Sequence, residues 1–114
     1  MSVDKSLMTG STTMLILKLL SGTDMYGYQM IEELARRSEQ TFALKTGTLY
    51  PLLHGLEEQG AVSSYEREER GRPRRYYHLE RKGQKLLSEK QEEWERFNGA
   101  VDLVMKGGVS GAGA

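Results

Sequence analysis

Four arginines surround a Gly-Arg-Pro turn in this 114-residue chain: Arg70, Arg72, Arg74 and Arg75. A guanidinium group presents a rigid fork of N–H donors that matches the oxygens of a phosphate, and a lysine ammonium lacks this fork. The window of residues 70–85 holds seven basic residues against a single acidic one. The remainder is acidic, since residues 1–69 sum to −4 and residues 86–114 to −2. The sequence therefore predicts a phosphate-binding surface in a chain of zero formal net charge.

A second polar group opens a leucine-rich stretch at residues 46–60, TGTLYPLLHGLEEQG. The spacing of its leucines predicts a helix with one buried stripe, formed by Leu49, Leu52, Leu53 and Leu56. The opposite side has little charge and carries Thr46, Thr48, Tyr50, Pro51 and His54. Threonine hydroxyls can bond base edges or phosphates, and a helix N-terminus attracts phosphate. This helix is therefore a second candidate for contact with nucleic acid, with Thr46 or Thr48 as its cap and Gly60 as its terminator.

Residues suited to catalysis or metal binding are sparse. His54 and His78 are the only histidines, they fall in different predicted elements, and neither has a carboxylate at ligand spacing. The chain has no cysteine and shows no glycine-rich phosphate loop after a strand. We therefore expect no enzyme activity, no metal and no cofactor. The longest apolar run is far too short for a membrane span and no secretion signal is visible, so we expect a cytoplasmic protein.

Two helices are predicted before the leucine-rich stretch. MLILKLLS, capped by Ser11, Thr12 or Thr13, is read as a helix because methionine and leucine dominate it, although a buried strand also fits the run. An apolar surface on all sides needs burial on more than one of them. YGYQMIEELARRS is the second helix, with Asp24 as a possible N-cap. Its expected buried face comprises Tyr28, Ile31, Leu34 and Ala35. A loop or short strand, EQTFALK, follows.

Two β-rich segments, AVSSYEREE and RRYYHLE, flank the sequence RGRP and predict a hairpin. Gly71 can adopt a positive φ at the turn. Alternation then places Arg75, Tyr77 and Leu79 on one face and Arg74, Tyr76 and His78 on the other.

The longest predicted helix spans residues 81–106 and carries a seven-residue apolar repeat. Its two registers are Leu87, Trp94 and Val101, and Lys90, Phe97 and Val104. Such a repeat on a terminal helix is typical of helix pairing. The order of elements predicts a mainly α (α+β) protein, in which residues 11–80 form a winged helix-turn-helix and residues 81–106 a dimerisation helix. Residues 1–10 are expected to be a flexible leader and residues 107–114 a disordered tail.

Four motifs follow the same order as these elements: MLILKLLS, YGYQM, GTLYPLLHGLEEQGAV and GRPRRYYHLERKGQKLL. Together they resemble the PadR family of bacterial transcription regulators over residues 7–97. The resemblance implies a homodimeric repressor that binds a palindromic DNA operator. It also places the chain in the short branch of the family, in which a single C-terminal helix forms the dimer. Tyr26 and Glu80 depart from the family pattern, which often has histidine and threonine at these places.

The predicted DNA contacts combine the leucine-rich helix and the hairpin. They are Lys45, Thr46, Gly47, Thr48, Tyr50, Pro51, His54, Arg70, Arg72, Arg74, Arg75 and Tyr76. A narrow tip that carries arginine suits a minor groove, where negative potential is concentrated. A charged tip is also compatible with ordinary solvated surface, and His54 fits a simple exposed position equally well. The alternative function is a winged-helix module that binds a protein and not DNA.

Trp94 has two interpretations. A single tryptophan on an apolar seam suits a core or dimer anchor, whereas some PadR proteins hold flat aromatic compounds at the dimer interface against a tryptophan that Trp94 matches. The candidate effector-binding residues are Trp94, Phe97, Leu15, Leu19, Met8 and Met14. The candidate dimer-interface residues are Leu15, Leu87, Trp94, Phe97, Val101 and Val104. An effector at Trp94 would change the spacing of the two DNA-binding halves, and a regulator without an effector is the alternative.

Overall fold

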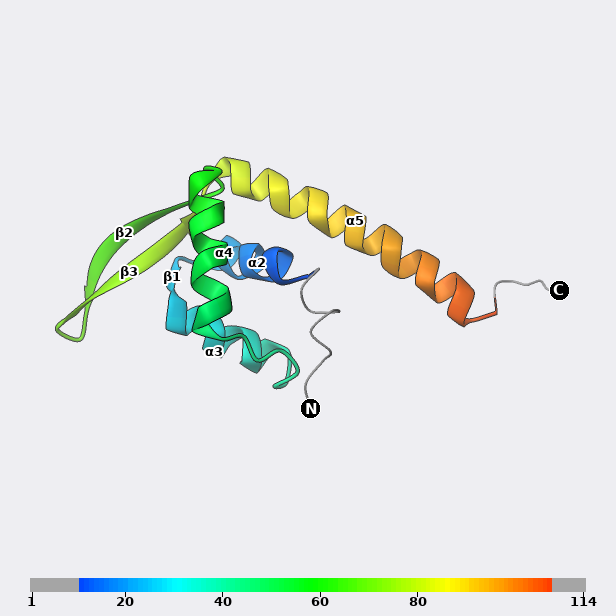
Figure 1. Cartoon of the computed structure of the whole chain (residues 1–114), viewed down its shortest axis with the longest axis horizontal. Coiled ribbons are helices and arrows are strands. Elements are labelled where there is room, and N and C mark those ends of the chain that lie inside the picture. The colour runs from blue at the N-terminus through cyan, green and yellow to red at the C-terminus, as the bar shows by residue number, and fades with distance from the viewer. Residues whose placement is uncertain (1–10, 108–114) are drawn as a thin grey trace.

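Three helices and a small sheet form the body of the protein, and one long helix extends away from it (Figure 1). The computed structural model describes residues 11–107, so the predicted leader, Met8 and residues 108–114 lie outside the described residues. The elements are α2 (Thr12–Gly22), β1 (Met25–Tyr26), α3 (Gly27–Arg37), α4 (Thr46–Glu58), β2 (Val62–Glu69), β3 (Arg72–Leu79) and α5 (Arg81–Met105). This arrangement confirms the predicted mainly α, winged-helix class. No helix within the described residues is long and apolar enough to span a membrane.

The hydrophobic core is centred on α2, because its apolar residues point in nearly every direction. Ile16, Leu17, Leu19 and Leu20 are almost completely buried against the leucine stripe of α4, one face of α3 and the sheet. This confirms the prediction of a helix for the apolar run. Ser11 occupies the N-cap position, but its side chain makes no capping hydrogen bond.

The start of α3 differs from the prediction. Tyr26 is the N-cap in place of Asp24, and the Gln29 side chain accepts a hydrogen bond from the backbone N–H of Tyr26 at 3.1 Å. The buried face comprises Gly27, Met30 and Leu34. Tyr28, predicted to be buried, is 59% exposed. The buried face of α3 is therefore displaced by about one residue from the predicted face. The reason is that α3 meets α4 at Gly27, where a tyrosine would not fit.

A two-residue strand, β1, completes a three-stranded antiparallel sheet in the order β1-β3-β2. Met25 pairs with Tyr77, and Tyr26 pairs with Tyr76. Sequence reasoning missed this strand because two residues are too short to show an alternating pattern. β1 nevertheless joins the entry of α3 directly to the hairpin.

β2 and β3 form the predicted hairpin, which we call the wing. Glu69 pairs with Arg72, so the turn contains only Arg70 and Gly71. Their φ angles are +52° and +80°, as in the type I′ turn whose twist suits antiparallel strands. The register confirms the two predicted faces: Arg75, Tyr77 and Leu79 lie on the core face, and Arg74, Tyr76 and His78 lie on the outer face.

The first turn of α5 packs closely against the start of β2. The backbone N–H of Glu80, the N-cap, donates to the carbonyl of Ala61 at 2.9 Å, and the Glu80 carboxylate accepts a hydrogen bond from Ser63 at 2.6 Å. Gly83 is buried against the same carbonyl, and a Cβ at this position would overlap the Ala61 oxygen. Gly83 therefore permits the close approach of α5 to the start of β2.

Replacing Gly83 with alanine should destabilise the fold by about 1–3 kcal/mol, since the methyl group would force backbone atoms apart. Gly99 lies in the same helix with open space around it, so Gly99→Ala should instead stabilise by up to about 1 kcal/mol through helix propensity. Urea unfolding of both variants at one protein concentration measures the two effects. If both variants change the free energy of unfolding in the same direction, the packing role of Gly83 is contradicted.

Candidate nucleic-acid interface

The N-terminal turn of α4 is open to solvent. Leu49 and Leu53 are completely buried and fix the orientation of the helix, so that its other side faces outward. The exposed residues at this end are Lys45, Thr46, Gly47, Thr48, Pro51 and His54. Lys45 is the N-cap and no side chain caps the helix, so neither Thr46 nor Thr48 has the predicted capping role. The first N–H groups of a helix have no intrahelical acceptor, and together with the helix dipole they favour an anion.

Tyr50 lies at the border between this open turn and the α3–α4 contact. It is 37% exposed, and its hydroxyl lies against Gly27 at the start of α3. A Cβ at Gly27 would overlap that hydroxyl group. Tyr50 therefore supports the packing of α3 on α4 and leaves only part of its ring for a ligand.

The tip of the wing carries Arg70 and Arg72, both exposed. Neither side chain forms an ion pair with another described residue of the chain. In Figure 1 the tip and the N-terminal end of α4 both reach the lower side of the molecule, whereas α5 starts at the opposite end of α4. The open N–H groups of α4 and the arginines of the tip thus lie on a common side.

The two arginines farther from the tip contact protein groups. The guanidinium carbon of Arg74 lies 4.7 Å from the centre of the Tyr26 ring, and its Nε is buried without a hydrogen-bond partner. Arg75 Nη2 lies 3.4 Å from a carboxylate oxygen of Glu57. The Nε of Arg74 is therefore closed off from solvent beside the Tyr26 ring, while the charge of Arg75 is partly neutralised by Glu57.

Tyr76 is buried, which is inconsistent with its predicted contact with DNA. It is 3% exposed because Tyr26 packs edge-on against it at 5.4 Å, Tyr65 stacks at 5.8 Å and the Arg67 guanidinium carbon lies 4.8 Å from its ring centre. Its hydroxyl donates to Glu69 at 3.1 Å. Burial and the Glu69 carboxylate raise the pKa of Tyr76. The residue supports the wing from inside an aromatic cluster.

The sequence analysis did not single out Arg67 as a residue of the basic surface, because three glutamates lie close to it in β2. The register places it directly opposite Arg74 on the outer face. Two like charges at such a pair are unfavourable, and the stacking of each guanidinium on a tyrosine ring spreads them apart. Arg67 lies two residues after Tyr65 in β2, so the two share the outer face. This alternation is the signal in the sequence that could have identified Arg67.

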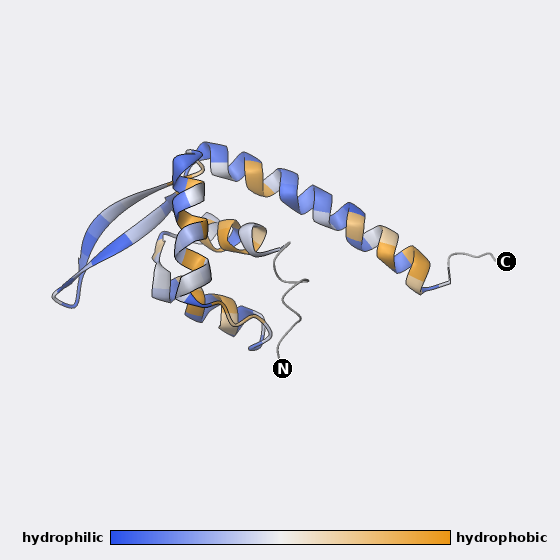
Figure 2. Cartoon of the chain, viewed as in Figure 1, coloured by the Kyte–Doolittle hydropathy of each residue, from blue (hydrophilic) through white to orange (hydrophobic). Residues whose placement is uncertain are grey.

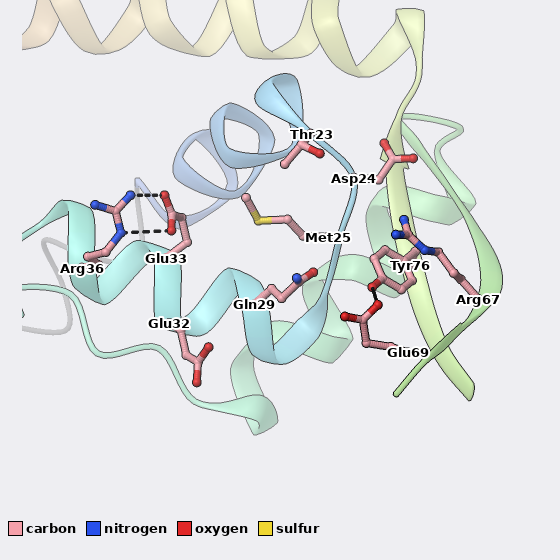
Figure 3. Close-up of a pocket in the computed structure, with 10 residues that line it drawn as sticks. All are labelled: Thr23, Asp24, Met25, Gln29, Glu32, Glu33, Arg36, Arg67, Glu69 and Tyr76. Atoms are coloured by element: carbon pink, nitrogen blue, oxygen red, sulfur yellow. Dashed lines mark hydrogen bonds and ion pairs between the residues drawn. The ribbon is translucent and has the colours of Figure 1, made fainter. Parts of the chain in front are cut away.

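A cleft of about 470 Å³ lies beside the wing, between α3 and the tip half of β2 (Figure 3). Its carboxylates are Asp24, Glu32, Glu33 and Glu69. Only Arg36 and Arg67 oppose them, and Arg36 is already paired with Glu33. The excess of negative charge disfavours phosphate, so we place this cleft outside the candidate interface.

An apolar pocket of about 300 Å³ lies between α2 and α5. It is lined by Ser11, Met14, Leu15, Lys18, Phe42, Leu87, Gln91 and Trp94. Three predicted effector residues, Met14, Leu15 and Trp94, therefore come together at one place. Phe42 was not predicted, because it reaches the pocket from the loop after α3.

Other predicted residues of this pocket lie elsewhere. Leu19 is 2% exposed within the core and does not line the pocket. Phe97 lies one turn beyond Trp94 on α5 and does not line the pocket within the protomer. Leu87, predicted as a dimer contact, is largely buried in its own chain.

The C-terminal half of α5 exposes a series of apolar side chains, visible as orange bands in Figure 2. The predicted dimer residues among them are Trp94, Phe97, Val101 and Val104. Phe97 is 68% exposed, which is a large unfavourable surface for an isolated helix in water. This apolar face is therefore available to a partner.

The comparisons with known proteins agree with this arrangement. Residues 16–89 match the model described as the Transcriptional regulator PadR-like family. The chain is 34% identical over 82 residues to Transcriptional regulator Rv3488 of Mycobacterium tuberculosis, with 72% of this chain and 74% of that protein covered. An uncharacterised protein of Lysinibacillus sphaericus is 31% identical over 106 residues, with 92% and 97% covered.

Solved structures show the same similarity. A transcriptional regulator from Clostridium thermocellum superposes with a TM-score of 0.80 at 30% identity, covering 86% of this chain and 96% of that one. A PadR family transcriptional regulator from Eggerthella lenta gives 0.78 at 30% identity, covering 88% and 86%. The family consists of transcription regulators and not of enzymes. With a family model matched over most of its folded body, the chain belongs to the PadR-like family of transcriptional regulators.

Proposed function

We propose that this chain is a homodimeric repressor that binds a palindromic DNA operator and is released by a planar aromatic molecule beside Trp94. The observation that carries the DNA-binding part is the common side of the wing tip and the open N-terminal turn of α4 (Figure 1). Membership of a family of transcription regulators supports it. Like the regulators it resembles, the chain is proposed to act in the bacterial cytoplasm.

The N-terminal turn of α4 is proposed to enter the major groove. Thr46 and Thr48 supply hydroxyls for base edges or phosphates, and Lys45 reaches the phosphate backbone. A Cβ at Gly47 would meet nothing in the protein, so this side is free for the close approach of a DNA strand. The short side chains at the turn favour direct contact between the helix end and the groove.

The wing is proposed to bind the flank of the same half-site. Arg70 and Arg72 project from a two-residue turn that is narrow enough for a minor groove. The guanidinium of Arg74, which lies over the Tyr26 ring, is proposed to contact a phosphate oxygen farther from the tip. The wing then contributes affinity and orientation, and α4 contributes most of the base recognition.

The apolar face of α5 is proposed to pair with a second copy. The helix has 25 residues, which corresponds to a length of about 37 Å. Full burial of each large apolar side chain on this face would contribute about 1.5–3 kcal/mol. Pairing through α5 would set two α4 helices about one turn of DNA apart, as a palindromic site requires.

The pocket beside Trp94 is proposed to bind the effector. Trp94 lines the pocket together with apolar residues of α2 and with Phe42, and Lys18 and Gln91 supply polar groups to the lining. A planar aromatic ring suits such a slot. Because the pocket lies between α2 and α5, a bound molecule would alter the angle of α5 to the DNA-binding body and so reduce operator affinity.

Replacing Arg72 with alanine should weaken binding to every duplex and lower the salt dependence by about one unit of slope, as expected for loss of one phosphate contact. Thr48→Ala should instead change the preferred bases at one or two positions. Fluorescence anisotropy with duplexes selected from a random pool by the wild-type protein measures both effects.

The matched control for this experiment is Arg96→Ala, which removes the same charge from an exposed site on α5. It should leave affinity unchanged. Equal effects of Arg72→Ala and Arg96→Ala would show that the wing tip makes no specific contact. If the wild-type protein recovers no duplex at all, the alternative of a protein-interaction module is favoured.

Replacing Phe97 with glutamate should dissociate the dimer, because a charge would be forced into the apolar seam. Leu103→Glu is a closely matched control, since Leu103 is 65% exposed and Phe97 is 68% exposed on the same helix. Leu103 lies nine residues, or two and a half turns, beyond Trp94 and so on the opposite side of α5. Analytical ultracentrifugation should show a monomer only for Phe97→Glu; a dimer there would refute the proposed seam.

Trp94 is the only tryptophan, so its fluorescence reports directly on the pocket. Planar aromatic carboxylates should quench it saturably and lower operator affinity over the same concentrations. Lys18→Met keeps the length of the side chain and removes its charge, so it should weaken carboxylates but not neutral aromatics. If no compound of a broad aromatic panel quenches the fluorescence of Trp94, the alternative of a regulator without an effector is favoured.

A further inference from the structure

The turn between α2 and β1 is tied to the wing by one side chain, Asp24. One carboxylate oxygen accepts a hydrogen bond from the Tyr65 hydroxyl in β2 at 2.6 Å. The other oxygen lies 2.8 Å from Nδ1 of His78 in β3. Asp24 therefore bridges both strands of the wing, and we call this group of three residues the clasp.

The clasp lies on the outer face of the wing, where Tyr26 also packs against Tyr76 and Arg74. On this side the backbone connection is β1, which pairs with β3 through only two residues. The turn that holds Asp24 leads directly through β1 into α3. A change in the clasp would thus alter the angle of the wing to the helices while the hydrophobic core, on the other face of the sheet, stays packed.

His78 gives the clasp a dependence on pH. Its hydrogen bond with Asp24 raises the pKa of His78 above its ordinary value, and the nearby Glu80 acts in the same direction. Partial burial raises the pKa of Asp24, but the hydrogen bonds from Tyr65 and His78 outweigh it and leave that pKa lowered. Arg67 also lowers it, whereas Ser63, which pairs with His78 across the strands, is uncharged.

We propose that Asp24 is a positioning residue that holds the wing in its DNA-binding orientation, and that operator affinity falls as His78 of the clasp loses its proton. The proposal rests on the proposed DNA-binding function. Asp24 carries a negative charge and lines the acidic cleft, so it is proposed to act through the wing and not by contact with DNA (Figure 3).

The direction follows from the ion pair. Because the pKa of His78 is raised in the folded state, the full ion pair is present below about pH 6.5, the ordinary pKa of histidine. It weakens to a neutral hydrogen bond as pH rises through the raised value. Affinity for the operator should therefore fall between pH 6 and pH 8.5, by at most about tenfold for each unit by which the pKa is raised.

The experiment measures affinity against pH for the wild-type protein and two variants, using a duplex selected by the wild-type protein from a random pool. Asp24→Asn should bind more weakly at pH 6 and show little dependence on pH. His78→Asn keeps an amide N–H near the place of Nδ1 but does not titrate, so it should bind with a flat profile, close to the wild type at pH 8.5 and weaker than the wild type at pH 6. Wild-type dependence on pH in His78→Asn would overturn the proposal.

Two controls separate the clasp from other causes. His54 is the other histidine and lies on α4, so His54→Gln should keep the dependence on pH whatever its effect on affinity. Hydrogen exchange of the free protein should be corrected for the intrinsic rate of exchange. The protection of β3 should then fall as pH rises in the wild type, and it should be low at every pH in Asp24→Asn. Protection in α2 should not change.

The exchange measurement also distinguishes failure of the clasp from failure of the proposed function. If hydrogen exchange in the wing depends on the protonation of His78 but no duplex binds, the proposed DNA binding is refuted and the holding role of Asp24 is retained. Wing exchange that is identical in the wild type and Asp24→Asn would refute the clasp, even if DNA binding is confirmed.

Discussion

The carbonyl of Ala61 fixes the relative positions of the three functional parts. The N–H of Ala61 donates to the carbonyl of Leu56 and ends α4, while its C=O accepts the N–H of Glu80 and closes the base of the wing. Gly83 then brings the first turn of α5 onto the same oxygen. Because α4, the wing and α5 all contact the backbone of Ala61, none of them can be displaced at this point without affecting the other two.

Neutralisation within the protein determines which arginines remain for a ligand. Arg36 is paired with Glu33, whose pKa is lowered to about 2, and Arg75 lies near Glu57. The tip arginines Arg70 and Arg72 have no such partner among the described residues. The zero net charge of the chain is therefore a sum over an acidic side, which includes the cleft by α3, and a basic tip.

Patterns within one element were predictable, and contacts between distant elements were not. The leucine stripe of α4 and the alternation of the wing depend on neighbouring residues, so the helix and both strand faces were predicted correctly. Burial of Tyr76 depends on Tyr26, fifty residues earlier, and no local pattern reveals it. Likewise Trp94 was placed correctly beside Leu15, whereas Lys18 and Phe42 enter the pocket through the packing of α2 and a loop. Residue types thus indicated the chemistry of the site, and tertiary packing determined which of the residues are accessible.

The length of α5 has a mechanical consequence. The buried residues of the helix, Gly83 and Leu87, lie in its first two turns, and the part from Leu87 to Met105 extends for about 27 Å beyond them. A rotation of only about 5° at the anchor would move the far end by about 2 Å, by simple leverage over that length. A pocket next to the anchor is thus the place where a small displacement has the largest effect, since sub-ångström changes between α2 and α5 are multiplied along the helix before they reach its exposed apolar end.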